Sequence, residues 1–267
     1  RHPHRGFETI TVVRSGVIDH ADSLGARARY GNGDIQWLTA GDGINHAEMF
    51  PLINTGRGNP TDFFQIWLNL PAVDKRVPPH FSMFWAKDVP KLSLEDSAGH
   101  KIEVTLIAGE YEKTKALCPP PHSWASSAKS DLAIWIIELE AKAQWKLRGA
   151  QPGTVRSLYT LGDGEVQMSG RRVGARNHVE LNGAKEVSIV NGNSPIVLLL
   201  MQARPIGEPV ARYGPFVMNT NAEISEAIRD YRATQFGGWP WDTEDPTHGC
   251  SFKRFARHAD GRWEEPV

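Results

Sequence analysis

The stretch "HPHRGFETITVV", residues 2–13, joins two histidines spaced by one residue to a run of β-branched side chains. Residues 9–13, "TITVV", are β-branched throughout, which favours a strand. If the histidine pair is extended as well, His2 and His4 point to the same side, about 6.6 Å apart along the chain. This stretch therefore predicts a sheet that presents two imidazoles on one face.

The rest of the chain is divided into short apolar segments by many turns. Glycine (25 residues) and proline (18 residues) exceed their usual combined share of roughly 12% among the 267 residues. Three consecutive prolines in "CPPPHSW", residues 118–124, cannot donate to a β-ladder and mark a loop or linker. Two similar β domains, joined near residues 109–130, are therefore predicted. The predicted strands are residues 9–13, 17–20, 35–38, 63–70, 102–108, 132–139, 157–161, 186–190 and 195–202.

One segment near the end, "NTNAEISEAIRDYRATQFGG" (residues 219–238), predicts a helix. Thr220 and Glu223 form a capping-box pattern at its start, and Gly237-Gly238 supplies a stop signal. Its apolar residues recur at helical spacing and predict a face turned toward the core: Ile224, Ala227, Ile228 and Tyr231.

The composition excludes several classes of protein. The chain has 30 Lys and Arg against 31 Asp and Glu, which argues against direct binding of nucleic acid. Its longest apolar run, "PIVLLLM" from Pro195, is the length of a strand, so no membrane span is expected. Cys118 and Cys250 are far apart and suggest no disulfide framework, which suits the cytoplasm. The chain begins with Arg1 in a patterned segment, so we expect further residues upstream, where a targeting signal would lie.

A second pair of metal-ligand residues, His46 and Glu48, occurs in "GDGINHAEMF", residues 41–50. Two neighbouring strands that each offer such a pair to one barrel interior can surround a single ion. Three imidazoles and a carboxylate suit Fe(II), Mn, Ni, Cu or Zn, and such a site keeps positions open for catalysis. Each pair alone is a weak signal. Spacing alone leaves open whether the four residues share an ion or are unrelated.

Other polar and aromatic residues are weaker candidates. Glu8 is expected to support a ligand or the structure rather than to bind metal. His178 and Glu180 repeat the His-x-Glu spacing without a His-x-His partner, so a second metal is not expected there. Three tryptophans in strand segments are predicted to belong to the core rather than to a substrate platform: Trp37, Trp67 and Trp135.

Two long stretches, "HPHRGFETIT" (residues 2–11) and "GDIQWLTAGDGINHAEM" (residues 33–49), resemble the signature segments of the pirin family, within the bicupin superfamily. "RPIGEPVARYGPFVMNTNAEISEAIRDY" (residues 204–231) is similar to the pirin C-terminal region. The resemblance implies an all-β fold of two tandem cupin β-barrel (jelly-roll) domains with a short C-terminal helix. Residues 1–115 would form the metal-binding domain, with its first strands upstream of Arg1, and residues 116–267 a cupin-like domain without metal.

The resemblance also implies a site and an activity. His2, His4, His46 and Glu48 would hold one divalent metal, typically Fe(II), with Ni, Mn, Cu or Zn as alternatives. The activity would be that of a quercetin 2,3-dioxygenase, in which O2 opens a flavonol-like substrate and carbon monoxide is released. Glu48 would also serve as the catalytic proton acceptor. The alternative is a non-enzymatic, metal- or redox-responsive protein that regulates a transcription factor or metabolic enzyme through a protein partner.

Overall fold

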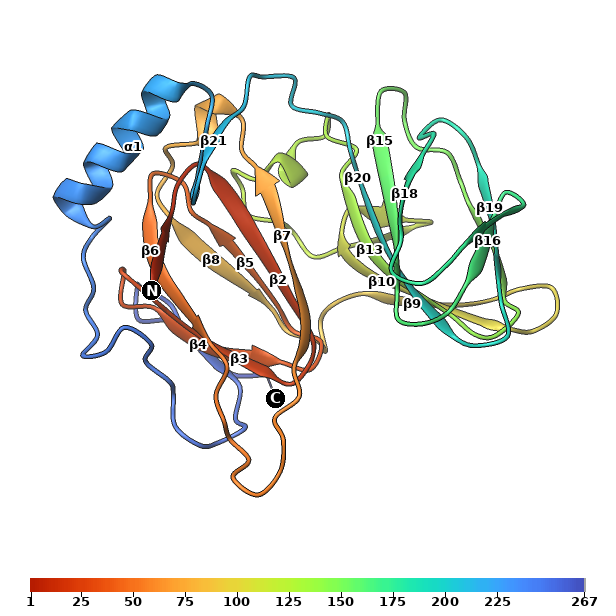
Figure 1. The fold of residues 1–267 in the computed structure, drawn as a ribbon, viewed down its shortest axis with the longest axis horizontal. Helices are drawn as coiled ribbons and strands as arrows, with labels where there is room; N and C mark the ends of the chain where they lie inside the picture. Colours follow the sequence, from red (N-terminus) through yellow and green to blue (C-terminus); the bar gives the residue numbers. More distant parts are fainter. Residues whose placement is uncertain (267) are drawn as a thin grey trace. The chain divides into compact units, whose positions relative to one another are not determined.

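The computed structural model describes residues 1–266, and the chain divides into two compact units. The first unit contains residues 1–88, 119–124 and those from 207 onward, and the second contains residues 89–118 and 125–206. Strands dominate both units, and the single α-helix of the described residues, α1 (Asn221–Thr234), lies near the C-terminus, as predicted (Figure 1).

The predicted domain boundary at residues 115 and 116 differs from this division. Residues 89–115 belong to the second unit, because β10 (Lys101–Ala108) pairs with β13 (Ala133–Leu139). The C-terminal segment belongs to the first unit, because β23 (Phe255–Arg257) pairs with β4 (Arg27–Gly31). Pairing between strands that are distant in sequence leaves no local signal. The prediction therefore relied on the proline-rich loop to locate the domain boundary.

Two sheets face each other in the first unit (Figure 1). The first sheet contains, in spatial order, β1 (His2–His4), β6 (Ile44–Met49), β3 (Val17–Asp22), β4, β23 and β24 (Trp263–Glu264). The second contains β7 (Asp62–Asn69), β2 (Phe7–Ser15), β5 (Ile35–Thr39) and β8 (His80–Phe84). Because side chains alternate along a strand, every second residue points into the space between the sheets.

The second unit contains its own pair of sheets around an apolar core. One sheet has the order β18 (His178–Leu181), β15 (Val155–Leu161), β20 (Ile196–Ala203), β13, β10 and β9 (Lys91–Glu95). The other has the order β14 (Gln144–Leu147), β19 (Val187–Asn191), β16 (Val166–Met168) and β17 (Arg171–Val173). The core between them includes Trp135, Ile137, Leu158, Ile189 and Leu198, all buried.

Helix α1 packs on the hairpin formed by β21 (Ala211–Tyr213) and β22 (Phe216–Met218). The capping box of Thr220 and Glu223 forms as predicted. The helix ends slightly before the predicted glycine stop, because Gln235 already adopts a left-handed conformation (φ 52°). Within residues 1–266, no helix has both the length and the apolar character needed to cross a membrane.

The segment after the helix returns along the outside of the first sheet. The buried Asp19 carboxylate binds Arg29 (2.6 Å) and also accepts a hydrogen bond from the backbone of His248 (2.8 Å). Arg254 bonds to the buried carboxylate of Asp34 (2.8 Å). These contacts explain why the C-terminal residues complete the unit that begins the chain.

Candidate metal centre

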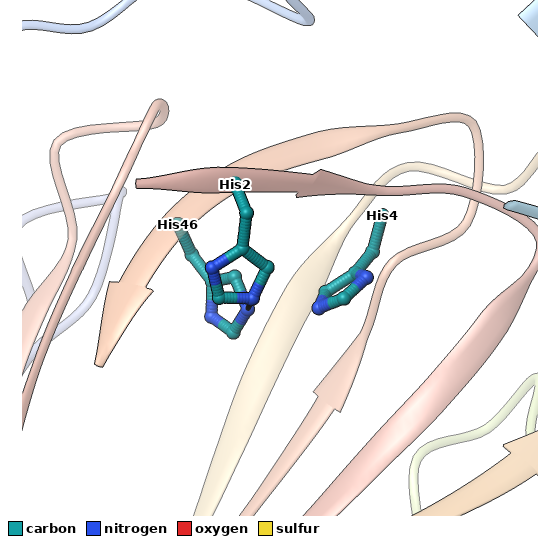
Figure 2. Close-up of side chains that lie close together, drawn as sticks. All are labelled: His2, His4 and His46. Atoms are coloured by element: carbon teal, nitrogen blue, oxygen red, sulfur yellow. Dashed lines mark hydrogen bonds between the residues drawn. The ribbon is translucent and has the colours of Figure 1, made fainter. Parts of the chain in front are cut away.

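Three histidines converge in the first unit. His2 and His4 extend from one face of β1, and His46 comes from the adjacent strand β6, where it is the register partner of His2 (Figure 2). One ring nitrogen of each histidine lies within 4.8 Å of those of the other two. Their ring centroids are 4.5 to 4.9 Å apart. The two pairs recognised in the sequence therefore contribute three side chains to one cluster.

The surroundings keep these imidazoles neutral. His46 and His4 are almost fully buried, whereas His2 is exposed at the edge. Burial, reinforced by the neighbouring His2, lowers the pKa of His4 to about 3. Burial also lowers the pKa of His46 well below its ordinary value, and lowers that of His2 against the opposing effect of Glu48. A neutral imidazole has a free lone pair, which is the form that binds a metal ion.

The hydrogen-bonding pattern also fits a metal ion. The Nε2 atoms of His46 and His2 lie 2.9 Å apart, and Nδ1 of His46 is buried without a partner. The ring nitrogens of His4 make no well-formed hydrogen bond, although the Pro215 backbone partly opposes the fall of its pKa. Buried polar atoms without partners are costly, and a cation shared by the three imidazoles would satisfy one nitrogen of each ring. The donor set therefore fits one divalent transition metal.

Glu48, the fourth expected ligand, lies outside this group of close nitrogen atoms. It projects from the same face of β6 as His46, two residues away. Its Oε1 accepts a hydrogen bond from Thr11 (3.2 Å), and both of its oxygens accept from Nε2 of Gln65 (3.0 Å each). Glu48 is therefore an oriented carboxylate on the same face of β6 as His46.

Two residues of β3 that the sequence did not single out extend this polar interior. His20 is the register partner of Glu48, and Asp22 is that of His46. The His20 ring lies 5.5 Å from that of His46, and its Nε2 is 3.1 Å from Oδ2 of Asp22. Both side chains are fully buried. No short sequence motif predicts the positions of His20 and Asp22, because only the pairing of β3 with β6 brings them beside His46.

Trp67 was predicted to be a core residue, and its position shows that prediction to be wrong. Trp37 and Trp135 are buried, but Trp67 is 41% exposed. Its ring packs on Phe7 (4.4 Å between centroids) and meets the edge of His4 (5.6 Å). Trp67 therefore borders the histidine cluster and has a surface open to solvent.

Glu8 has the structural position that was expected for it. Its side chain points to the opposite face of β2 from Thr11 and accepts a hydrogen bond from Thr39 (2.8 Å). Burial raises its pKa to about 7, against the lowering effect of hydrogen bonds from Ser123, Thr39 and Trp37. Glu8 therefore braces the sheet behind the site and does not face the histidines.

Two buried cations hold the backbone that follows the His2–His4 pair. Arg5 donates to the backbone oxygen of Asp42 (2.6 Å) and to the carboxylate of Asp230 (2.7 Å). Nζ of Lys75 donates to the carbonyl oxygens of Gly6 (2.8 Å) and Val217 (2.9 Å) and to the side chain of Asn69 (2.7 Å). These contacts fix the direction in which β1 presents its imidazoles.

The His-x-Glu repeat in the second unit has no comparable setting. His178 is exposed, stacks on Tyr159 (4.6 Å) and lies 3.0 Å from the hydroxyl of Ser157. Glu180 is exposed on the same strand. His122, in the proline-rich loop, is exposed, and its Nδ1 lies 2.9 Å from the carboxylate of Asp74.

Comparison with known proteins identifies the class to which this fold and site belong. The family model described as Pirin matches residues 1–68, and the model described as Pirin C-terminal cupin domain matches residues 134–237. The predicted fold of tandem cupin domains is confirmed by these matches and by the solved structure described below. The chain belongs to the pirin family.

Individual relatives align with most of this chain. It is 34% identical to a Pseudomonas aeruginosa protein provisionally named quercetin 2,3-dioxygenase, over 88% of this chain and 78% of that one. It is 33% identical to a pirin-like protein of Solanum lycopersicum, over 88% of this chain and 76% of that one. The crystal structure of quercetin 2,3-dioxygenase from Acinetobacter baumannii matches with a TM-score of 0.78 and 32% identity, over 89% of this chain and 78% of that one.

Proposed function

We propose that the first unit binds one divalent metal ion through His2, His4 and His46, with Glu48 as the carboxylate of the same site. The observation that carries this proposal is the convergence of three imidazoles, with one ring nitrogen of each within 4.8 Å of those of the other two. Fe(II) is the metal we propose, and the same donors also suit nickel, manganese, copper and zinc.

The activity we propose is that of a quercetin 2,3-dioxygenase, in which O2 cleaves a flavonol-like substrate and carbon monoxide is released. The names of the Pseudomonas and Acinetobacter relatives support this choice. When bound, the metal would polarise the substrate's oxygen atoms as a Lewis acid. We also propose a cytoplasmic location, which the two free cysteines, Cys118 and Cys250, support.

The protein's own groups would orient the substrate and move its proton. Glu48 is the carboxylate placed to accept the proton of a flavonol hydroxyl. Thr11 and Gln65 hold its two oxygens, and the carbonyl of Gln65 in turn accepts a hydrogen bond from Nε1 of Trp67 (3.0 Å). This chain of contacts fixes the carboxylate, so little reorganisation is needed when the proton moves.

The first test is quercetin-dependent oxygen uptake by protein reconstituted with Fe(II), with carbon monoxide measured in parallel. His46→Ala should lose uptake and metal together. The matched control is His178→Ala, because that exposed histidine lies in the second unit and outside the three-histidine cluster. Stoichiometric metal without uptake would overturn the dioxygenase proposal and favour the metal-responsive binding protein, to be tested by isolating a stoichiometric partner.

Glu48→Gln separates metal binding from proton transfer. The amide keeps the size of the side chain but cannot act as a base at neutral pH. We expect the metal content to stay at or above about half the native level, because the three imidazole ligands remain. Turnover should fall about 100-fold or more, because the proton acceptor is lost. Native turnover in this variant would remove Glu48 from the mechanism.

A further inference from the structure

An exposed arginine stacks on the tryptophan that borders the histidines. Cζ of Arg212 lies 5.0 Å from the centre of the Trp67 ring, a distance at which a guanidinium and an indole attract each other. The other contacts of Trp67 are made with Phe7, His4 and Gln65. Trp67 therefore contacts both Arg212 and His4, one of the histidines of the proposed metal centre.

The hairpin that carries Arg212 is hydrogen-bonded to the backbone that follows His4. In the hairpin, Arg212 is the register partner of Val217. The backbone N–H of Val217 donates to the carbonyl of Arg5 (3.0 Å), the residue that follows His4. Its carbonyl also accepts from Lys75 (2.9 Å). The position of Arg212 relative to His4 is therefore set by backbone contacts and not only by a surface side chain.

The guanidinium of Arg212 has unused hydrogen-bonding capacity. Within residues 1–266, no carboxylate lies within ion-pair distance of it and no side-chain hydrogen bond satisfies it. Arg5, on the neighbouring backbone, is by contrast engaged by Asp42 and Asp230. A guanidinium stacked on a ring keeps its N–H edge free, and that edge matches an anionic oxygen group in a bidentate manner.

The face of β7 that carries Trp67 suits a flat ligand. Phe63 lies four residues before Trp67 on the same face of β7, is 39% exposed, and packs against Phe50 (5.4 Å between centroids). Between the two aromatic positions lies Gln65, which binds Glu48. Exposed aromatic side chains on both sides of the polar group favour a planar aromatic ligand.

We propose that the natural substrate is a small aromatic molecule with an anionic oxygen group, and that Arg212 binds this group. The proposal rests on the proposed function, because it assigns a recognition residue to the same site. The metal-binding oxygens of the substrate would face the histidines, while its acidic group would meet the guanidinium above Trp67. Arg212 would then determine which aromatic substrates the site accepts.

The test uses two ligands that differ only in the acidic group: catechol and 3,4-dihydroxybenzoate. Their affinities for the zinc-loaded protein are measured by calorimetry, because zinc does not oxidise either compound. The native protein should bind 3,4-dihydroxybenzoate about tenfold more tightly, a modest preference because solvent screens the bidentate contact with the exposed guanidinium. The preference should shrink as the salt concentration rises.

Arg212→Gln should reduce the affinity ratio to about one, and Arg212→Lys should keep part of it, because lysine keeps the charge but loses the planar fork. The matched control is Arg171→Gln, an exposed arginine of the second unit, which should keep the native ratio. Zinc content, measured for each variant, reports that the site is intact.

Three outcomes would overturn the proposal: a ratio near one in the native protein, a native ratio in Arg212→Gln, or no binding of either ligand. Each is independent of the dioxygenase activity, since none requires turnover. Failure of the proposed function would instead appear as stoichiometric metal without oxygen uptake, even if the carboxylate preference were present.

Discussion

The two units enclose contrasting interiors between their paired sheets. In the second unit, the inward positions of β13 are Ala133, Trp135, Ile137 and Leu139, all part of one apolar core. In the first unit, the corresponding space receives three imidazoles together with His20 and Glu48. Both interiors bury apolar surface, and the first unit has an apolar cluster that includes Ile18 and Leu38. Only the first interior also holds a group of buried imidazoles that lack a full set of partners.

This difference separates stability from function within one chain. Buried apolar surface stabilises a fold by about 25 cal/mol for each Å² removed from water. A buried polar atom left without a partner costs about 1–3 kcal/mol. The second unit therefore has the interior of a stable scaffold, whereas the first unit retains a costly arrangement that a bound metal would offset. Substitutions that make one interior resemble the other test this contrast.

The largest expected effect follows from making the first interior apolar at its centre. His46→Val should reduce bound metal from about one ion per chain to less than about a tenth, because only two imidazoles remain and neither comes from β6. Metal content is measured by elemental analysis after dialysis against a defined concentration of Fe(II) or Zn(II). Ile137→Val, a similarly buried position of the second unit, should keep its full metal content. Equal metal in both variants would contradict the three-histidine site.

The next effect concerns the apolar interior. Leu198 is fully buried in the second unit, and Leu198→Ala should lower the free energy of unfolding by about 2–5 kcal/mol through lost burial and a residual cavity. Urea titration with fluorescence detection measures this change. Metal bound per folded chain should stay at the native level, since Leu198 belongs to the unit without the histidines. A loss below about 1 kcal/mol would mean that the core relaxes around the gap.

Glu8 gives a third comparison, because it is a buried acid outside both the apolar core and the histidine cluster. Its folded pKa of about 7 is above the ordinary value of 4.5, so the folded state keeps a proton that the unfolded chain has released between these values. Stability should therefore fall as pH rises from about 4.5 to 7, by roughly 3 kcal/mol in total. Glu8→Gln cannot ionise and keeps an acceptor for Thr39, so it should lack this contribution.

The measurement is urea unfolding of both proteins at pH 5 and pH 8. The difference between Glu8→Gln and the native protein is the informative quantity, because other titrating groups contribute equally to both. The variant should gain relative stability at pH 8. Parallel changes in the two proteins would show that Glu8 titrates normally in the folded state.

Local sequence patterns predicted where the elements lie along the chain better than which elements contact one another in space. Residues 9–13 lie within β2, and the capping box marks the start of α1, because both signals arise from adjacent residues. The i, i+2 spacing brought His2 and His4 to one face, as strand geometry requires. The resemblance to pirins then implied that the second pair, His46 and Glu48, shares this site. His46 joins the cluster, and Glu48 lies outside it, two residues along the same strand.

Features that depend on strand pairing could not be predicted from the sequence. His20 reaches His46 only because β3 pairs with β6, and no motif records that register. Trp67 occurs in an apolar run typical of a core strand, yet β7 is an edge strand of its sheet, so its ring is open to solvent. The return of the C-terminal segment to β4 likewise has no local signal.

The smallest expected effect is also the most direct test of the cost of the polar interior. His4 is 3% exposed, packs on Phe7 (5.0 Å between centroids), and makes no well-formed hydrogen bond through its ring. His4→Leu replaces this imidazole with an apolar side chain in contact with an aromatic ring. In the presence of a chelator, the variant should be more stable than the native protein by about 1 kcal/mol. Denaturant midpoints measure the difference.

Metal should reverse this order. At a free metal concentration 100 times the dissociation constant, the native protein gains about 2.7 kcal/mol, whereas the variant has lost a ligand and gains less. His178→Leu, at an exposed imidazole of the second unit, should behave like the native protein in both conditions. If His4→Leu is less stable than the native protein even with chelator present, the imidazole contributes to packing in its own right. The polar interior would then be part of the scaffold and not a cost that the metal offsets.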